Sequence, residues 1–428
     1  MQLALTPEEA AFRDELRTFK PHHSCCAHRE SLLFEEAAQK WRQLMQLALT
    51  DEEATFRDEL RDFYATEIPA EIRDRVRRGL EIGRDDIATS HKILHANGLA
   101  VPNWPVEWGG KDWTLAQRQI WLDEMQLACV PEPLNFNTKM VGPVIAEFGS
   151  QQTKERFLPA TASLDIWWCQ GFSEPEAGSD LASLRTTAIR DGDSYVVNGQ
   201  KTWTTLGQYA DWIFCLVRTD PQAPKRQAGI SFLLIDLDTP GITMRPIKLI
   251  DGGVEVNEVF FEDVRVPADQ LVGEENQGWT YAKFLLGNER TGIAGVGRTK
   301  VRLAEVKRHA RETGRLDDPL FAARLTELEN EVLALELTQM RVVSGSAEGK
   351  PNPVSSVLKL RGSQLAQAAS ELLVEVAGPD ALPKGADVAS PDWAQRAAPV
   401  YLNYRKTSIY GGSNEVQRNI ISSTILGL

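Results

Sequence analysis

The chain has 428 residues, enough for about two to four domains, and its hydrophobic (42%) and charged (25%) fractions suit a globular protein rather than a disordered, collagen-like or coiled-coil chain. No apolar run approaches the length of a membrane span. With 47 basic and 60 acidic residues the net charge is −13, which argues against a nucleic-acid-binding protein because such proteins must neutralise phosphates.

The N-terminus contains a repeat. Residues 1–20 and 45–64 are identical at sixteen of twenty positions, and each copy begins with Met and carries the Thr-x-x-Glu pattern of a helix capping box. A solenoid needs at least three repeats, and no third copy follows. We therefore interpret residues 1–44 as an extension that partly duplicates the first helix, with the domain proper opening at Met45.

Two histidine-containing segments resemble metal sites only in composition. Residues 22–28 (HHSCCAH) match no standard zinc spacing, and no second ligand pair follows them. His91 and His95 are four apart on a predicted helix, where an ordinary surface pair is the simpler interpretation. The cysteines form no C-x-x-C pair and the N-terminus lacks a signal-peptide pattern, so we expect a reducing, cytoplasmic location without disulfides or a metal site.

Residues 45–164 are predicted to form an N-terminal helical domain. Apolar periodicity indicates helices over 86–97 and 115–128. Ser150 is placed to cap a further short helix that ends before Pro159.

Residues 165–278 change in character and are predicted to form a middle β-domain. Short segments rich in Val, Ile, Phe and Trp alternate with turn residues, and no helical pattern intervenes. They should therefore pair mainly antiparallel as a small barrel or sandwich. The predicted strands are 194–198, 212–218, 230–236, 242–247 and 257–266.

Residues 279–428 are predicted to form a C-terminal helical domain, whose last helix begins at Ser413 after two glycines. The other amphipathic stretches are 280–310, 318–346 and 353–377. Residues 292–297 (GIAGVG) fall inside the first stretch with no strand before them. We therefore interpret them as small residues for close helix packing, not as a dinucleotide fingerprint.

Two segments of the β-domain carry candidate ligand groups. Residues 167–181 (WWCQGFSEPEAGSDL) are polar and rich in turn residues, so Ser173, Ser179 and backbone N–H groups are suited to a heterocycle or a phosphate. In KTWTT, Trp203 is suited to stacking on a flat ring and Thr205 to donating to a ring nitrogen. On pattern alone, a tryptophan buried in the core of the barrel is the competing interpretation.

Several motifs in order resemble the acyl-CoA dehydrogenase family over residues 45–428. They are SEPEAGSDL, GQKTWTT, VFFEDVRVP and YGGSNEVQRNI. The segments GWTYAKFLLGNERTGIAGVGR and YLNYRKTSIYGGSNE most resemble its pimeloyl-CoA dehydrogenase large-subunit branch. The resemblance implies a mainly α fold with a central β-domain, in which a helical domain, a β-barrel or sandwich and a helical bundle meet around FAD.

The resemblance also implies FAD contacts in the β-domain. Phe172 and Ser173 would face the pyrimidine side of the flavin. Ser179 would lie near the pyrophosphate and the CoA arm of the substrate, and Trp203 and Thr205 would flank the isoalloxazine ring at its reactive nitrogen.

Further contacts are implied in the C-terminal domain, some of them from a second subunit. Arg311 would bind the pyrophosphate there. Glu375 and Gly378 lie in EVAGP, where the family usually has a Gln and a Gly-rich turn. Ser413 and Glu415 occupy FAD-contacting positions after the active-site loop.

The position of the catalytic base departs from the commonest family pattern. Forming the α,β double bond needs a base for the α-proton, and a carboxylate in a dry pocket suits that role. Many members carry this Glu where the chain has Gly411, whereas another branch takes it from the first helix after the β-domain, just before an Arg. We therefore expect Glu289 to be the base, with Arg290, Gly411 and Gly412 contacting substrate; the alternative is an exposed, ion-paired Glu289.

The expected activity is conversion of an acyl-CoA to the trans-2-enoyl-CoA, with electrons passing through FAD to an electron-transfer flavoprotein. The expected assembly is a homo-oligomer, either dimer or tetramer, or a hetero-oligomer with a smaller homologous subunit. Two alternatives stay open: a flavin oxidase or monooxygenase, and a non-catalytic partner subunit. The acyl chain is not readable, although the branch suggests fatty or dicarboxylic acid β-oxidation.

Deleting residues 1–44 is expected to leave flavin content and melting temperature nearly unchanged, because only one of the two copies can occupy the docking site of the first helix. The full chain is compared with a chain that opens at Met45, by flavin absorbance and thermal unfolding. A large loss of either quantity would show that the first copy has a structural role.

Overall fold

The computed structural model describes residues 49–428 apart from 81, 290–293, 345–352 and 383–388. The first copy of the repeat and the histidine-rich segment lie outside these residues. In the second copy the capping box is formed as expected, since Glu53 N–H donates to Thr50 Oγ1 at 3.2 Å and Thr50 N–H donates to the Glu53 carboxylate at 2.9 Å. The chain divides into two compact units, Met1–Phe56 and Arg57–Leu428, and the site lies in the second.

The N-terminal part is helical, as predicted. Its helices are α3 (Asp51–Thr66), α4 (Ala70–Arg77), α5 (Arg84–Ala96), α6 (Leu115–Leu127), α7 (Gly142–Phe148) and α8 (Gln151–Ser163), with a π-helical turn at Phe136–Val141. Ser150 caps α8 by accepting the Thr153 N–H at 3.1 Å. The prediction that this helix ends before Pro159 is wrong, because α8 accommodates the proline and continues to Ser163.

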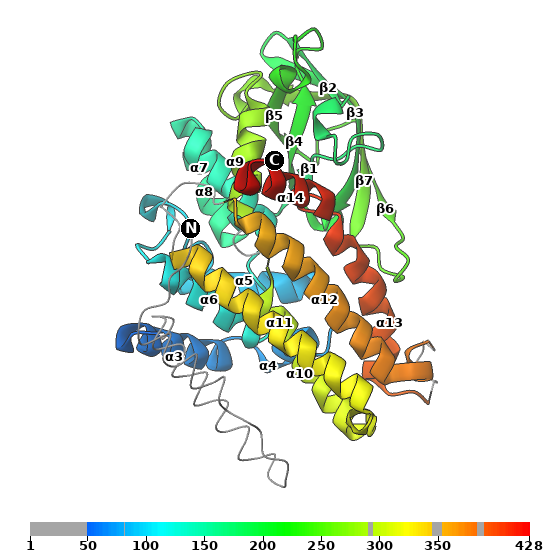
Figure 1. Cartoon of the computed structure of the whole chain (residues 1–428). Coiled ribbons are helices and arrows are strands. Elements are labelled where there is room, and N and C mark those ends of the chain that lie inside the picture. The colour runs from blue at the N-terminus through cyan, green and yellow to red at the C-terminus, as the bar shows by residue number, and fades with distance from the viewer. Residues whose placement is uncertain (1–48, 81, 290–293, 345–352, 383–388) are drawn as a thin grey trace. The chain divides into compact units, whose positions relative to one another are not determined.

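The middle part is a seven-stranded sheet in the order β1-β4-β2-β3-β7-β6, with β5 paired to β4 (Figure 1). The strands are β1 (Trp168–Gly171), β2 (Thr187–Asp191), β3 (Ser194–Thr205), β4 (Trp212–Arg218), β5 (Ile230–Asp236), β6 (Ile242–Ile247) and β7 (Val256–Pro267). The predicted antiparallel pairing is confirmed except at β4, which pairs in parallel with β1 and β2. The sequence missed β1, β2 and the second half of β3.

The C-terminal part is a helical bundle in which α10, α11 and α12 run side by side (Figure 1). Its helices are α9 (Gly278–Glu289), α10 (Val296–Glu312), α11 (Pro319–Ser344), α12 (Ser355–Ala377), α13 (Asp392–Tyr404) and α14 (Asn414–Ile420). The expected single helix over 280–310 is wrong, since Gly295 starts α10 with a left-handed φ of +59°. Close packing by small residues is confirmed at Gly297, where an added Cβ would lie 2.8 Å from Gln126.

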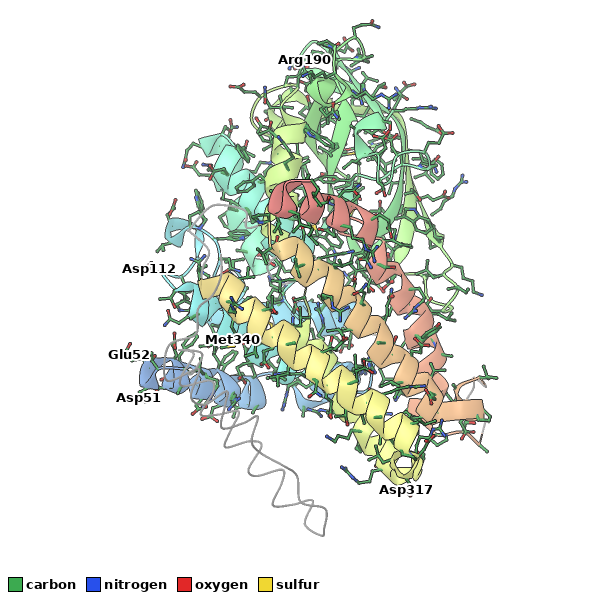
Figure 2. All side chains as sticks on the ribbon, viewed as in Figure 1. Asp51, Glu52, Asp112, Arg190, Asp317 and Met340 are labelled. Atoms are coloured by element: carbon green, nitrogen blue, oxygen red, sulfur yellow. The ribbon has the colours of Figure 1, made fainter. Side chains whose placement is uncertain are left out.

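Some side chains at the ends of these elements are exposed. Figure 2 labels Arg190 on β2 and Asp317 in the turn between α10 and α11, and both are exposed. The three cysteines in the described part, Cys129, Cys169 and Cys215, are buried free thiols. Among the described residues no cluster of metal-ligating side chains is found, and no helix is long and apolar enough to cross a membrane.

His91 lies inside the N-terminal part, not on its surface as the sequence suggested. Its ring is fully buried, and Nδ1 accepts the backbone N–H of Leu134 at 3.1 Å, so Nε2 carries the proton and donates to the Ala162 carbonyl at 2.9 Å. The ring therefore links α5 to α8. Burial lowers the pKa of His91 to about 4, which keeps the ring neutral in the folded protein.

We expect this histidine to make stability depend on pH. The pKa of His91 is about 4 in the folded protein and 6.5 in the unfolded chain. The contribution of the neutral ring to the free energy of unfolding is therefore complete above pH 6.5 and is lost as the pH falls toward 4. The shift corresponds to about 3 kcal/mol of unfolding free energy. His91→Gln keeps a donor and an acceptor without titrating, so its urea midpoint should fall less over this range than that of the wild type.

His95→Gln is the matched control, because His95 is exposed on the same helix. It should reproduce the pH dependence of the wild type. The same dependence in His91→Gln would contradict the role of the buried ring.

Candidate active site

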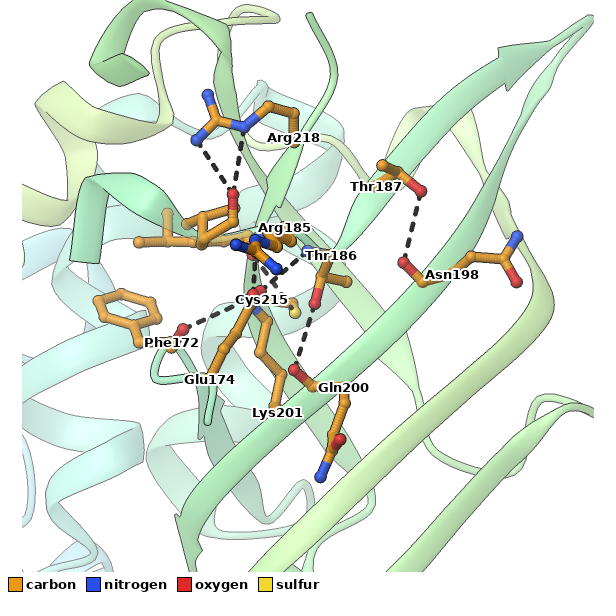
Figure 3. A network of polar contacts seen from close by, with 12 residues as sticks. Phe172, Glu174, Arg185, Thr186, Thr187, Asn198, Gln200, Lys201, Cys215 and Arg218 are labelled. Carbon is orange, nitrogen blue, oxygen red and sulfur yellow. Dashed lines mark hydrogen bonds and ion pairs between the residues drawn. The ribbon is translucent and has the colours of Figure 1, made fainter. Parts of the chain in front are cut away.

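A buried ion pair ties the loop after β1 to strand β3. The Lys201 ammonium is fully buried and donates to the Glu174 carboxylate at 2.7 Å and to the Phe172 carbonyl at 3.2 Å. The same carboxylate accepts the backbone N–H groups of Arg185 at 2.6 Å and Thr186 at 2.9 Å (Figure 3). Burial alone would raise the pKa of Glu174, but Lys201 and the other donors bring it below its usual value. We call these five residues the clasp.

The clasp brings the two β-domain motifs together. Next to it, the backbone N–H of Thr202 donates to the Ser173 carbonyl at 2.9 Å. Phe172 and Ser173, from the first motif, therefore adjoin the strand segment that carries Trp203 and Thr205, from the second. The structure thus unites four of the residues for which the sequence implied contacts to one flavin ring.

Trp203 is displayed by an irregularity in β3. Between the pairs Lys201–Val259 and Thr204–Asn257, β3 has two residues where β7 has one, which is a β-bulge. Trp203 has a φ of +60°, a strained value for a bulky residue, and it is 58% exposed although its neighbours in the strand are buried. A core position for this tryptophan is therefore excluded. Backbone strain of this kind gathers at ligand sites.

The polar groups beside Trp203 fit a flat heterocyclic ligand. Thr205 and Ser173 are partly exposed. The hydroxyl of Thr204 is buried and has no hydrogen-bond partner within the part of the chain that the structure describes. Since an unsatisfied buried hydroxyl costs free energy, a ligand or water at this point is favoured.

Phe172 is buried, whereas Ser179 is exposed. The Phe172 ring is buried and packs edge-on against Phe214 and Phe232, with ring centroids 5.8 Å and 6.2 Å away. Its ring therefore belongs to the core of the β-domain. Ser179 is exposed in the loop that the clasp holds.

The active-site loop implied by the resemblance is a tight turn before α14. Gly411 and Gly412 have left-handed φ values of +64° and +81°, which glycine adopts without strain. Gln417 donates to both of their carbonyl groups, at 3.1 Å and 3.3 Å. Ser413 caps α14 by accepting the Val416 N–H at 3.3 Å, as predicted.

Glu415 follows in the first turn of α14 and is exposed, with an ion pair to Arg418 at 3.3 Å. Hydrogen bonds from its own backbone N–H and from Ser413 lower its pKa. A negative charge at this helix N-terminus is favourable.

One cavity adjoins both segments expected to act on the substrate. It has a volume of about 310 Å³, and its lining includes Ala294 and Gly295, which follow Glu289 by five and six residues, and Tyr410, just before the glycine turn. Glu289 is the last residue of α9; its side chain and Arg290 lie outside the described residues. A larger hollow of about 670 Å³, beside α5 and α8, contains none of the expected site residues.

The remaining expected flavin contacts lie where α10 and α12 end. Glu375 pairs with Arg315 at 2.8 Å and with Arg324. Burial opposes ionisation of Glu375, but hydrogen bonds from the two arginines lower its pKa. Gly378 terminates α12 with a φ of +53°, and Arg311 is exposed in the last turn of α10.

Arg311, Glu375 and Gly378 lie far from the glycine turn of the same chain. Lys359, near the start of α12, donates to Asn414 of α14 at 3.2 Å. Glu375 lies about 24 Å farther along the helix, at about 1.5 Å per residue. The two groups therefore stand near opposite ends of α12.

Sequence reasoning missed the clasp and the cationic side chains that line the cavity, which are Arg298, Arg302, Lys359 and Lys406. Lys201 and Glu174 both lie inside the quoted motifs, but they are 27 residues apart and meet only when the sheet forms. No local pattern marks the pair, because Lys201 stands among polar residues in GQKTWTT. The same holds for the cavity, whose lining comes from separate segments.

Three domain profiles of the acyl-CoA dehydrogenase family match the chain in order. The N-terminal domain profile covers residues 50–165, the middle domain profile 169–264 and the C-terminal domain profile 276–426. The matches follow the helical, β and helical parts described above.

Individual proteins show the same similarity. The chain is 40% identical over 339 residues to acyl-CoA dehydrogenase IpdE1 of Mycobacterium tuberculosis, covering 78% of this chain and 86% of IpdE1. The ChsE4–ChsE5 complex from Mycobacterium tuberculosis matches with a TM-score of 0.77 and 32% identity, over 89% of this chain and 98% of that one. The Tcur3481–Tcur3483 steroid ACAD matches with a TM-score of 0.79 and 29% identity, over 89% and 99%.

Lys201→Met is expected to lower the unfolding free energy by about 3–5 kcal/mol, because it leaves the Glu174 charge buried without its counter-ion. Adding Glu174→Gln should restore part of the loss, since it removes the uncompensated buried charge and its amide oxygen can still accept one of the two backbone N–H groups, which bond to different carboxylate oxygens. Urea unfolding of the two single variants and the double variant measures the coupling.

The exposed pair of Arg265 and Asp191 supplies the control. Its side chains are 58% and 62% exposed, so Arg265→Met should cost less than about 1 kcal/mol. A Lys201→Met loss no larger than this would show that the clasp does not hold the loop.

Proposed function

The chain belongs to the acyl-CoA dehydrogenase family of FAD-dependent oxidoreductases, and we propose that it forms the α,β double bond of an acyl-CoA thioester. The observation that carries the proposal is Trp203, displayed on a strained bulge beside the loop that the clasp holds. Stacking of a ligand on the exposed indole would offset the free-energy cost of the strained backbone.

FAD, when bound, supplies the acceptor for the hydride that leaves the β-carbon. Trp203 would stack on the flavin, and Thr205 and Ser173 would hydrogen-bond to it. Phe172, buried in the core of the β-domain directly before Ser173, would face the pyrimidine side of the flavin with its backbone. Ser179 would contact the pyrophosphate or the CoA arm.

Glu289 is the proposed base. The α-proton passes to its carboxylate, the carbanionic electron pair forms the double bond, and the β-hydrogen leaves as hydride. Two features support this assignment: the family's commoner base position is Gly411, and Glu289 directly precedes Arg290 at the end of α9. Arg290 and Gly412 would contact the substrate, and the Gly411 N–H would stabilise negative charge on the thioester oxygen.

The assembly that we propose contains at least two chains. Arg311, Glu375 and Gly378 lie near the end of α12 opposite the glycine turn, so they are suited to the adenosine half of a neighbour's FAD. Ser413 and Glu415 would contact FAD from the other end. The neighbour would be a second copy of the chain or a smaller homologous subunit; similarity to the ChsE4–ChsE5 complex, named for two proteins, supports a hetero-oligomer. An electron-transfer flavoprotein would accept the electrons.

The substrate branch is also part of the proposal. The sequence resembles pimeloyl-CoA dehydrogenase large subunits, which favours a dicarboxylic acyl group. One of the similar structures named above is the Tcur3481–Tcur3483 steroid ACAD, which favours a bulky acyl group.

Anaerobic mixing of the FAD-loaded protein with acyl-CoA thioesters tests the activity. Flavin absorbance should bleach with an acyl-CoA and not with free CoA. A protein that cannot be reconstituted with FAD would overturn the proposal. Rapid reoxidation by air would identify an oxidase, and bleaching that needs a second subunit's base would identify a non-catalytic partner.

Glu289→Gln is expected to lower turnover by about a hundredfold to ten-thousandfold, because it removes general-base catalysis. FAD content and acyl-CoA affinity should change little, since the lost interaction belongs to the transition state. Stopped-flow bleaching measures the rate. Glu327→Gln, an exposed glutamate on α11, is the control and should leave the rate unchanged.

Adding Gly411→Glu to Glu289→Gln tests whether both positions reach the same α-carbon. Some activity should return, but only part of it, because the φ of +64° at residue 411 costs a non-glycine residue about 1–2 kcal/mol. Unchanged turnover in Glu289→Gln itself would end the assignment.

A further inference from the structure

The glycine turn before α14 contains backbone N–H groups that are free to bind a ligand. Those of Gly411, Gly412 and Ser413 have no hydrogen-bond partner within the part of the chain that the structure describes. Glycine has more backbone freedom than any other residue, so two glycines in succession would not hold one conformation by themselves. The direction of the Gly411 N–H therefore depends on the contacts around the turn.

Gln417 of α14 holds the turn from one side. Its side chain is fully buried, and Nε2 donates to the Gly411 carbonyl at 3.1 Å and to the Gly412 carbonyl at 3.3 Å. The carbonyl and the N–H of a trans peptide point in opposite directions, and the described part of the chain has no cis peptide. The two hydrogen bonds therefore direct the N–H groups of Gly412 and Ser413 away from Gln417.

Lys406 holds the turn from the other side. Its backbone carbonyl accepts the N–H groups of Ile409 at 2.9 Å and Tyr410 at 3.1 Å, and its ammonium pairs with Glu255, directly before β7. The peptide that carries the Gly411 N–H thus lies between a peptide held by Lys406 and a peptide held by Gln417. The two contacts together fix its orientation.

The packing around Gln417 favours a role in the reaction over a role in stability. A Cβ at position 412 would lie 2.6 Å from Gln417 Nε2, so the contact requires a glycine there. The Gln417 Oε1 atom is buried without a partner among the described residues, which costs free energy. An apolar side chain of similar length would avoid this cost. The amide is therefore best explained by the two hydrogen bonds that it donates to the turn.

We propose that Gln417 is a positioning residue, which orients the Gly411 N–H toward the thioester oxygen of the substrate. There the N–H stabilises the enolate that remains when the α-proton is removed. A donor aimed at developing charge lowers the barrier most when its direction is fixed before the reaction. The inference rests on the proposed dehydrogenation, in which Glu289 takes the α-proton.

The test separates α-proton removal from hydride transfer on the FAD-loaded full chain. The probe is the 3-thia analogue of the acyl-CoA that bleaches the wild-type flavin fastest. Its sulfur replaces the β-carbon, so no β-hydrogen is present and the reaction stops at the enolate. An enolate beside oxidised flavin gives a long-wavelength charge-transfer band. The pH at which half of this band has formed measures how well the enolate is stabilised.

Gln417→Met keeps the approximate shape of the side chain and removes its donors. The midpoint pH of the band should rise by about one unit or more, a tenfold loss of enolate stabilisation, because the Gly411 N–H is no longer aligned. With the normal substrate and an artificial electron acceptor, kcat should fall at least about tenfold and KM should change less than about twofold. FAD content and melting temperature should stay near those of the wild type.

Gln417→Glu guards against misfolding of the methionine variant. It is nearly isosteric, and its carboxyl can donate to the turn only when it is protonated, which burial favours. Its turnover relative to the wild type should therefore rise as the pH is lowered from about 8 to about 6. Asn419→Asp makes the same change from amide to carboxyl at an exposed position of α14, so its relative turnover should not depend on pH.

The outcomes separate this inference from the proposed function. An unshifted midpoint in Gln417→Met would overturn the positioning role and leave the dehydrogenation standing. A relative turnover of Gln417→Glu that stays constant with pH would also contradict it. Loss of FAD from both variants would show that Gln417 supports the fold instead. No bleaching of the wild type by any acyl-CoA would overturn the proposed function and this inference with it.

Discussion

The buried ion pair between Lys201 and Glu174 is the interaction on which the rest of the site depends. It joins a turn-rich loop, whose ordering costs conformational entropy, to the middle of a strand. Arg218 adds hydrogen bonds to the Ala182 and Leu184 carbonyls of the same loop. Desolvating two charges is costly, and the cost is offset only because the carboxylate also accepts two backbone N–H groups and the ammonium also reaches a carbonyl. The pair thus satisfies five polar groups at one point and fixes the loop against the sheet.

The clasp also explains how Trp203 tolerates its backbone conformation. A left-handed φ on a bulky residue would relax if the strand were free to slip by one residue. Lys201 on one side and the Thr204–Asn257 pair on the other prevent that slip, because both are buried. The strain is therefore held by packing, and the indole remains directed out of the sheet.

The helical bundle divides its polar groups between the two ends of α12. At one end Lys359 and Ser363 meet Asn414 beside the glycine turn and the cavity. At the other end Glu375 is held by two arginines. A helix is a rigid spacer of about 1.5 Å per residue, so the same helix can serve one ligand at its start and a neighbouring chain's ligand at its end.

Local chemistry determined much of this protein from its sequence: five strands, the caps at Ser150 and Ser413, and the order of helical, β and helical parts. These follow from side-chain periodicity and from hydrogen bonds within a few residues. The tertiary structure alone decided that α8 continues through Pro159, that Gly295 interrupts the helix expected over 280–310, and that His91 is buried. It also decided that Lys201 meets Glu174 and that four cations from separate elements share one cavity. Each of these depends on contacts between residues distant in the chain, which no local pattern specifies.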